Sequence, residues 1–333
     1  MNERLFGTLA TGEAVHLYTL TNGSATLTVT SYGARVVSFV TYGRDIVGGF
    51  DTLEGYVADD SHQGSTIGRV ANRIEDASFT MDGAIYMLPD NDGGSCLHGG
   101  EGFDTQVWET KDASDDSVTF CYYSEDGEDG FPSGLAVTAK YTLSGSDLLI
   151  EYSATPEGKT PIALTNHTYF NLDGIGGDIA EHTVKLFADR YTAVNSNLIP
   201  TGERPWVDGT VYDLRGGRKI GEVLENGFWG YDNYFHLTPR EWLDYRGKML
   251  SLAAEISAGE LSMRVFTDRG GIQFYTGNFL GTGPAFKGGV SQVRHGAMCL
   301  EAGEEPNAPR RGEGFFEAGE TYTHTTLYSV TKK

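Results

Sequence analysis

The stretch Leu135-Ala136-Val137-Thr138-Ala139-Lys140-Tyr141-Thr142-Leu143 places apolar side chains at every second position. In an extended chain, successive side chains point to opposite faces, so this pattern predicts a strand with one buried and one polar face. Ser144-Gly145-Ser146-Asp147 follows as a turn, and the alternation resumes from Leu148 to Tyr152. Two alternating segments separated by a short Gly-containing turn predict an antiparallel hairpin.

The same alternation recurs far from this hairpin. It is present in Ala25–Thr30, in Leu261–Val265 and in the Thr- and Tyr-rich segment from Thr321 to Val330. Helical patterns are scarce, and only Arg218–Leu224 predicts a short helix, which Asn226-Gly227 would end. The sequence therefore predicts an all-β protein with few short helices.

No internal repeat, low-complexity tract or proline-rich linker divides the 333 residues. All-β sandwiches can reach this length as single units. We therefore expect one domain, residues 1–333, folded as a large antiparallel β-sandwich. The broad concave face of such a sandwich lets side chains from distant parts of the sequence form a single pocket.

The charge balance excludes two classes of partner. The chain carries 46 acidic and 25 basic residues, a formal net charge of -21. Nucleic acid and anionic membrane surfaces would both be repelled. No apolar run approaches the roughly 18 residues that a membrane-spanning helix needs. We expect neither a nucleic-acid nor a membrane partner.

The cysteines and histidines predict neither a disulfide framework nor a metal site. The three cysteines, Cys96, Cys121 and Cys299, are widely spaced and form no Cys-x-x-Cys pair. The eight histidines are scattered, without the spacings typical of metal ligands. No long apolar segment follows Met1, so a signal peptide is not predicted. A reducing compartment, the cytoplasm, fits these features.

One polar residue stands out within the segment Thr165–Leu172. The segment reads as a strand that Asp173-Gly174 ends, with His167 at its middle among apolar neighbours. We expect burial to hold this imidazole near the boundary between its neutral and charged forms, where it can exchange a proton at ordinary pH. The simpler interpretation is a core histidine whose nitrogens bond Asn166 or a backbone carbonyl.

Two arginines and an asparagine occupy Gly68–Ile74. Arg69, Asn72 and Arg73 could present donors to sugar hydroxyls or to an oxyanion. The alternative is an ordinary strand end with solvated arginines. In Leu97–Gly100, two glycines after His98 let the backbone approach a ligand closely, or merely form a turn.

Carboxylates and amides among aromatic or apolar residues form the remaining candidates. Asp232 and Gln273 each lie among aromatic residues and need partners if buried, because an unpaired buried polar group costs about 1–3 kcal/mol. Glu301 follows two apolar residues, and burial would raise its pKa toward values useful to a general base. A solvated acidic loop is the alternative, and it suits Glu304 and Glu305 better.

These segments together resemble the aldose 1-epimerases, or galactose mutarotases, in order and spacing from about Phe6 to Tyr328. The resemblance rests on five motifs, Gly68–Ile74, Leu97–Gly100, Asn166–Leu172, Gln273–Phe279 and Cys299–Glu301. It implies a mutarotase-type β-sandwich that interconverts the α and β anomers of free aldohexoses such as galactose and glucose. It also implies a monosaccharide substrate in hexose or galactose metabolism, no cofactor, no metal, and a monomer or homodimer.

The resemblance also implies roles for the residues of this chain that match the motifs of the family. His167 would be the general acid and Glu301 the general base, on opposite sides of the O5–C1 bond of one pyranose. The sugar site would be lined by six further residues, Asn72, Arg73, His98, Tyr169, Asp232 and Gln273. The chain departs from the family after Glu301, where Ala302–Asn307 replaces Thr-Gln, an aromatic residue and Pro-Asp. This difference bears on substrate preference rather than on the type of reaction.

Three other functions are compatible with a sugar-shaped pocket. A glycoside hydrolase would need two carboxylates flanking the scissile bond, for which Asp232 and Glu301 are the candidates, and would leave His167 unexplained. A non-catalytic sugar-binding module would need no acid and base together. A hexose-phosphate epimerase would need a basic cluster, and few cations besides Arg69 and Arg73 lie near the motifs.

Overall fold

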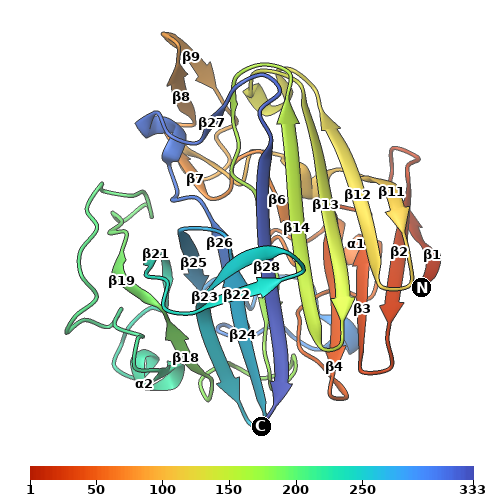
Figure 1. Cartoon of the computed structure of the whole chain (residues 1–333), viewed down its shortest axis with the longest axis vertical. Helices are drawn as coiled ribbons and strands as arrows, with labels where there is room; N and C mark the ends of the chain where they lie inside the picture. The colour runs from red at the N-terminus through yellow and green to blue at the C-terminus, as the bar shows by residue number, and fades with distance from the viewer.

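The computed structural model describes all 333 residues, and its long strands run side by side along the longest axis of the molecule (Figure 1). All pairings between its strands are antiparallel, and its helices are short, as the sequence predicts. The α-helices are α1 (Leu53–Val57) and α2 (Ile220–Leu224), and the 3₁₀ helices are η1 (Phe103–Thr105), η2 (Glu128–Gly130), η3 (Lys287–Gly289) and η4 (Ala308–Arg311). None of these helices has the length and apolar character needed to cross a membrane.

Three sheets make up most of the molecule. The first has five strands, β1 (Asn2–Thr8), β2 (Ala14–Thr21), β3 (Ala25–Thr30), β4 (Arg35–Thr41) and β5 (Arg44–Asp45). The largest has ten, in the spatial order β11 (Glu109–Ala113), β12 (Ser117–Ser124), β13 (Leu135–Ser144), β14 (Asp147–Pro156), β28 (Tyr322–Lys332), β24 (Leu261–Thr267), β23 (Lys248–Ala258), β18 (Thr183–Leu186) and β20 (Arg218–Lys219), with β22 (Trp242–Tyr245) beside β23. The third has five, in the order β17 (Tyr169–Phe170), β26 (Met298–Gly303), β25 (Gly271–Tyr275), β21 (Asp232–Leu237) and β19 (Ala188–Tyr191).

Four two-stranded pairs complete the fold. They are β7 (Arg73–Glu75) with β10 (Ser95–Leu97), β6 (Thr66–Ile67) with β16 (Thr165–Asn166), β8 (Ser78–Met81) with β9 (Ala84–Met87), and β15 (Thr160–Pro161) with β27 (Phe315–Phe316). Two of these pairs, β7–β10 and β6–β16, carry candidate site residues at or next to their ends.

The strands predicted from alternation are confirmed. β13 and β14 form the predicted hairpin, with Ser144 opposite Asp147 across the turn, and β3, β24 and β28 lie where the pattern places them. The predicted helix begins two residues late, at Ile220, because Arg218 and Lys219 pair with β18 instead. Helix α1 was not predicted; Thr52 caps it by accepting a hydrogen bond from the backbone N–H of Gly55.

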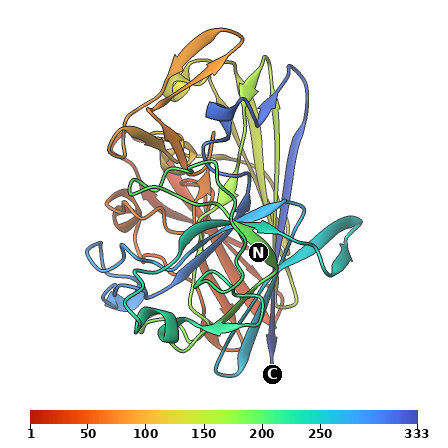
Figure 2. The same cartoon turned by 90° about the vertical axis from the view of Figure 1, so that its left-hand side faces the viewer.

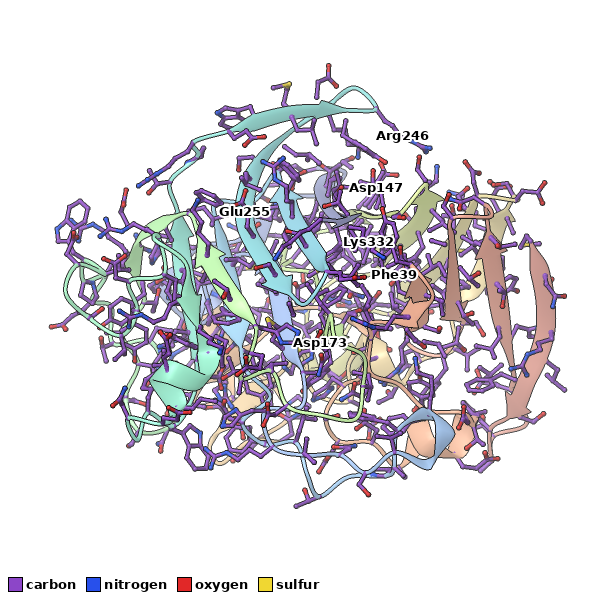
Figure 3. All side chains as sticks on the ribbon, turned by 90° about the horizontal axis from the view of Figure 1, so that it is seen from below. Phe39, Asp147, Asp173, Arg246, Glu255 and Lys332 are labelled. Carbon is purple, nitrogen blue, oxygen red and sulfur yellow. The ribbon has the colours of Figure 1, made fainter.

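The main core lies between the ten-stranded sheet and the two five-stranded sheets. Phe39 of β4, Tyr141 of β13 and Leu300 of β26 belong to one continuous buried cluster. Figure 2 shows the long strands on one side of the molecule, opposite loops and shorter strands. Seen from below, Phe39 lies among the side chains between the layers, whereas Arg246 lies at the outer tip of the β22–β23 hairpin (Figure 3).

The third sheet has one core face and one polar face. Phe170, Met298, Leu300, Phe274 and Ile272 alternate into the main core. Their sequence neighbours therefore point to the other side of the sheet. The residues on that side are Tyr169, Cys299, Glu301, Gln273 and Tyr275, brought together because Tyr169 pairs with Cys299, Gln273 with Glu301 and Tyr275 with Cys299.

The segment Thr165–Leu172 is not the single strand that we predicted. It is interrupted at His167, because β16 pairs with β6 whereas β17 pairs with β26. The His167 backbone bonds across the gap: its N–H donates to the carbonyl of Ser65 at 2.9 Å, and its carbonyl accepts from the N–H of Gly64 at 3.0 Å. His167 is thus fixed where the chain changes pairing partner.

Candidate active site

A cavity of about 480 Å³ opens on the polar side of the third sheet. This volume lies within the range typical of small-molecule sites. It is lined by Asp60, Ser61, His62, Asn72, Arg73, Asp92, Leu97, His98, His167, Tyr169, Asp232, Tyr275, Phe279, Leu280, Thr282 and Glu301. The family resemblance assigns eight residues to the site, and all of them except Gln273 are in this lining.

His167 and Glu301 face each other at the buried end of the cavity. His167 Nε2 and Glu301 Oε1 are 3.7 Å apart, and the two side chains are 7% and 5% exposed. No sugar ring fits between two atoms this close, because each non-bonded contact needs about 3.5 Å of its own. The expectation that the two groups lie on opposite sides of a pyranose is therefore wrong. The two side chains are neighbours in the cavity lining, so both contact a ligand from the same side.

Burial changes the pKa of both groups in opposite directions. Burial, with a smaller contribution from the nearby His62, lowers the pKa of His167 to about 3. Burial, with Asp232 as a second cause, raises the pKa of Glu301 well above its usual range, as predicted. The pKa of the imidazole does not stay near ordinary pH as expected, because the side chain is only 7% exposed and its charged form is poorly solvated. Burial favours the neutral form of each group.

Cys299 lies on the other edge of the His167 ring. Its Sγ is 3.5 Å from Nδ1, and burial raises the pKa of the thiol well above its ordinary value. The donor atoms of His167, Cys299 and Glu301 fall within 4.8 Å of one another. They do not fit a single metal ion, because Cys299 faces Nδ1 whereas Glu301 faces Nε2, and one ion can take only one ring nitrogen. The thiol of Cys299 instead contacts Nδ1 of His167, the ring nitrogen that does not face Glu301.

Asp232 lines the cavity, and Gln273 lies behind Asp232, out of the lining. Asp232 is the first residue of β21, and its pKa is raised by burial against the opposing influence of Arg73. Gln273 donates from its Nε2 to Asp232 Oδ1 at 2.7 Å. Its Oε1 is buried and has no hydrogen-bond partner in the protein. Gln273 therefore orients the Asp232 carboxylate.

The two arginines of Gly68–Ile74 have different surroundings. Arg73, the first residue of β7, lines the cavity, and its Nε donates to Asp92 Oδ2 at 2.6 Å. Arg69 is only 2% exposed and donates to the carbonyls of Pro132 and Ser133 at 2.7 and 2.8 Å. Arg69 therefore holds loops together, and only Arg73 is available to a ligand.

The loop after Glu301 is anchored rather than solvated. Glu305 has a side chain only 9% exposed, and it accepts hydrogen bonds from Thr192 Oγ1 at 2.5 Å and from Arg311 at 3.1 Å. Burial opposes its ionisation, but hydrogen bonds from His236, Arg204 and Thr192 outweigh burial and lower its pKa to about 2. Glu304 pairs with Arg269 at 2.7 Å. The expectation of a solvated acidic loop is wrong for Glu305, and neither residue lines the cavity.

Several residues that line the cavity were not predicted from the sequence, among them Asp60, Ser61, Asp92 and His62, of which His62 is the only histidine. His62 follows Asp60-Ser61 in a polar stretch that matches no motif, so its pattern gave no signal. Its Nδ1 lies 2.9 Å from Asp104 Oδ2, and its ring centroid is 4.7 Å from that of His98 and 5.9 Å from that of His167. His62, Asn72 and His98 all have positive φ, at 57°, 62° and 56°. Such backbone conformations in non-glycine residues cluster at functional sites.

Known proteins match the chain over almost its whole length. Residues 16–329 match the aldose 1-epimerase family. The galactose mutarotase of Rattus norvegicus is 37% identical over 339 residues, covering 98% of this chain and 97% of that protein. The aldose 1-epimerase of Escherichia coli K12 is 33% identical, with 95% of each chain covered. A solved structure of an aldose epimerase homologue from C. elegans superposes with a TM-score of 0.87 at 27% identity, covering 95% of this chain and 98% of that one.

Proposed function

This chain belongs to the aldose 1-epimerase family, and we propose that it converts the anomers of free aldohexoses by acid–base ring opening at His167 and Glu301. It is an isomerase that interconverts the α and β anomers of aldoses. The observation that carries the assignment of residues is the pair itself, an imidazole and a carboxyl group 3.7 Å apart at the buried end of one cavity.

The reaction needs two proton transfers at oxygens bonded to the same carbon. Glu301 takes the proton of the anomeric hydroxyl while His167 donates one to the ring oxygen, which breaks the C1–O5 bond and leaves an aldehyde. Rotation about C1–C2 presents the other carbonyl face, and closure runs the transfers backwards. Because O1 and O5 share C1, two groups that lie side by side serve both oxygens. Each well-placed acid or base contributes about 10²–10⁴-fold in rate.

The pair works while it holds a single proton. Burial favours the arrangement in which that proton sits on Glu301 and both groups are neutral. The reactive arrangement transfers it to His167, and the resulting charges attract each other by about 4 kcal/mol at this separation for an effective dielectric constant near 20. This attraction offsets part of the cost of desolvating the two charges, and hydrogen bonds from the hydroxyls of a bound sugar further stabilise the charged form.

The remaining lining residues hold the sugar and stabilise charge. Arg73 and His98 are donors placed to stabilise negative charge as it develops on oxygen. Further polar contacts come from Asn72, which directly precedes β7, from Tyr169 of β17 and from Asp232 of β21. Gln273 contributes through Asp232, to which it is bonded. We propose these six as the substrate-binding set.

We propose further that the protein acts in the cytoplasm on a monosaccharide, as a monomer or homodimer and without a cofactor. Three unpaired cysteines, two of them buried, suit a reducing compartment. The two proton transfers require only the side chains already named. The net charge of -21 keeps anionic polymers and surfaces away from the cavity.

Polarimetry on freshly dissolved α-D-galactose and α-D-glucose tests the activity. We expect the protein to bring the rotation to its equilibrium value much faster than buffer alone. Release of reducing sugar from an aryl glycoside would support a glycoside hydrolase instead. Galactose binding in a calorimetric titration without faster mutarotation would support a sugar-binding module, and activity confined to hexose phosphates would support a phosphosugar epimerase.

A further inference from the structure

Three imidazoles, those of His62, His98 and His167, line the cavity, and the proposed function gives a role to His167 and to His98 but none to His62. The rings of His62 and His98 meet edge to face, with centroids 4.7 Å apart. Both residues line the cavity. Their hydrogen bonds to the protein fix the protons on the two rings differently.

His98 is fixed as a hydrogen-bond donor. The backbone N–H of Asn72 donates to its Nδ1 at 3.2 Å, so Nδ1 must carry a lone pair. A neutral imidazole with a bare Nδ1 carries its proton on Nε2. Burial lowers the pKa of His98 well below its ordinary value and so keeps the ring neutral. His98 therefore offers the cavity an Nε2–H group.

His62 is fixed in the opposite tautomer. Its Nδ1 lies 2.9 Å from Oδ2 of Asp104, which also accepts from Arg35 at 3.2 Å. Burial opposes ionisation of this carboxyl, but His62 and Arg35 outweigh burial and lower its pKa, so Asp104 is an acceptor and Nδ1 of His62 carries the proton. The neutral ring then has a bare Nε2. The side chain is 22% exposed, so this acceptor is within reach of a ligand.

The segment that carries His62 is held rigidly. Asp59 accepts from the backbone N–H groups of Ser61 and Gln63 at 3.1 and 2.9 Å. The carbonyl of His62 accepts from the hydroxyl of Ser65 at 2.8 Å, and Ser65 in turn accepts from the backbone of His167. His62 thus keeps its position relative to His167, as a residue that selects among ligands must.

We propose that His62 is a specificity-determining residue that binds one sugar hydroxyl together with His98, His62 accepting the hydroxyl proton and His98 donating to the oxygen. A hydroxyl group is both donor and acceptor, so it satisfies two adjacent rings of opposite tautomer. The inference rests on the proposed function and adds a contact that recognises a hydroxyl at one position of the aldose. A site with this donor and acceptor rejects analogues that lack the hydroxyl, because its own polar atoms would stay unpaired.

Deoxy and deoxyfluoro galactoses separate the two halves of this contact. A fluorine accepts a hydrogen bond but cannot donate one, so it keeps the contact with His98 and loses the contact with His62. Dissociation constants would be measured by calorimetric titration for galactose and for each monodeoxy and monofluoro analogue. The proteins compared are the unaltered chain, His62→Phe, and the control His16→Phe, whose histidine lies on β2 and pairs with Glu3.

We expect the loss of binding affinity to depend on which hydroxyl of the sugar is replaced. His62→Phe weakens galactose binding about tenfold, as loss of one good hydrogen bond does. At one ring position the fluoro analogue binds the unaltered protein about tenfold more weakly than galactose, and His62→Phe weakens it no further. Analogues at the other positions lose the same tenfold as galactose, and His16→Phe changes none of the values. His62→Gln, which keeps an acceptor, recovers part of the loss and serves as the test if the Phe variant does not fold.

Two results would overturn the proposal. His62→Phe could bind galactose as tightly as the unaltered protein, or it could weaken galactose and every analogue by the same factor, as a purely structural role would. Because the readout is binding, it does not depend on turnover. If the unaltered protein binds sugars with this pattern but does not speed mutarotation, the proposed function fails and the His62 contact stands.

Discussion

Glu301 is a carboxyl group that the fold keeps away from water, at 5% exposure, beside an equally buried imidazole. Its chemistry follows from that position, because a carboxylate without solvent holds its proton more strongly. His167 shows the complementary effect, since burial makes its protonated form unfavourable. Both pKa shifts favour the neutral form of each residue, so the proton that the pair shares rests on Glu301.

Stability should depend on pH through Glu301. Its folded pKa is raised, so at low pH the folded and unfolded chains both hold the proton and the residue has no effect. As pH rises, the unfolded chain loses its proton first, and the unaltered protein loses stability until pH exceeds the folded pKa. We therefore expect Glu301→Gln to raise the melting temperature relative to the unaltered protein at pH 8 and to change it little at pH 4. An equal difference at both pH values would contradict this.

The sequence predicted which side chains form most of the site, but it did not predict how deeply each is buried or how burial shifts its pKa. His167, His98, Arg73 and Glu301 each belong to a recognisable motif, and all line one cavity. His62 belongs to no motif and reaches the cavity only because Asp104 and Arg35, distant in sequence, position its ring. The pKa of His167 could not be foreseen either, because it depends on how completely several elements exclude water.

The register between neighbouring strands determines which side chains lie together in the site. Alternation predicted the long strands well, because a half-buried sheet imposes a period of two residues. It failed at Thr165–Leu172, where backbone bonds to Gly64 and Ser65 interrupt the strand. Which strands pair is a long-range property, so the opposition of Glu301 and Gln273 in β26 and β25 could not be read from either strand alone.

The segment after Glu301 acts as an anchor for the end of β26. We expect Glu305→Gln to lower the free energy of unfolding by about 1–3 kcal/mol at pH 7, because the hydrogen bonds from Thr192, Arg204 and Arg311 lose their charged acceptor. The folded pKa of Glu305 is lowered to about 2, so its stabilising effect is full above about 4.5 and disappears as pH falls through 2. Urea unfolding at several pH values measures this.

Glu313 provides the matched control for that experiment. It pairs with the same Arg311 at 3.1 Å, but its side chain is 53% exposed. Glu313→Gln should cost at most about 1 kcal/mol, as exposed ion pairs do. If Glu305→Gln were no more destabilising than Glu313→Gln, the anchoring role would be wrong.

The whole molecule is a sandwich whose core runs without a break from β4 through the ten-stranded sheet to β26. Composition and alternation predicted this class of fold, because many half-buried strands with few helices can bury their apolar faces only against one another. The cavity lies where the third sheet meets the β7–β10 and β6–β16 pairs, an arrangement that depends on the complete chain.

The largest of the buried clusters contains residues of all three main sheets, which predicts one cooperative unit. We propose that residues 1–333 form a single domain and expect differential scanning calorimetry to give one transition, with equal calorimetric and van't Hoff enthalpies. Two separable transitions, or a proteolytic fragment that keeps its own cooperative unfolding, would show that the chain divides.

The most direct measurement is the initial rate of α-D-galactose mutarotation catalysed by Glu301→Gln and by His167→Ala, followed by polarimetry. Circular dichroism should first establish that each variant is folded. Glu304→Gln and His16→Ala are the controls, since neither residue lines the cavity. We predict that Glu301→Gln and His167→Ala are each slower than the unaltered protein by at least about 100-fold, while both controls keep their rate. Full activity in either folded variant would contradict the assignment of that residue to proton transfer.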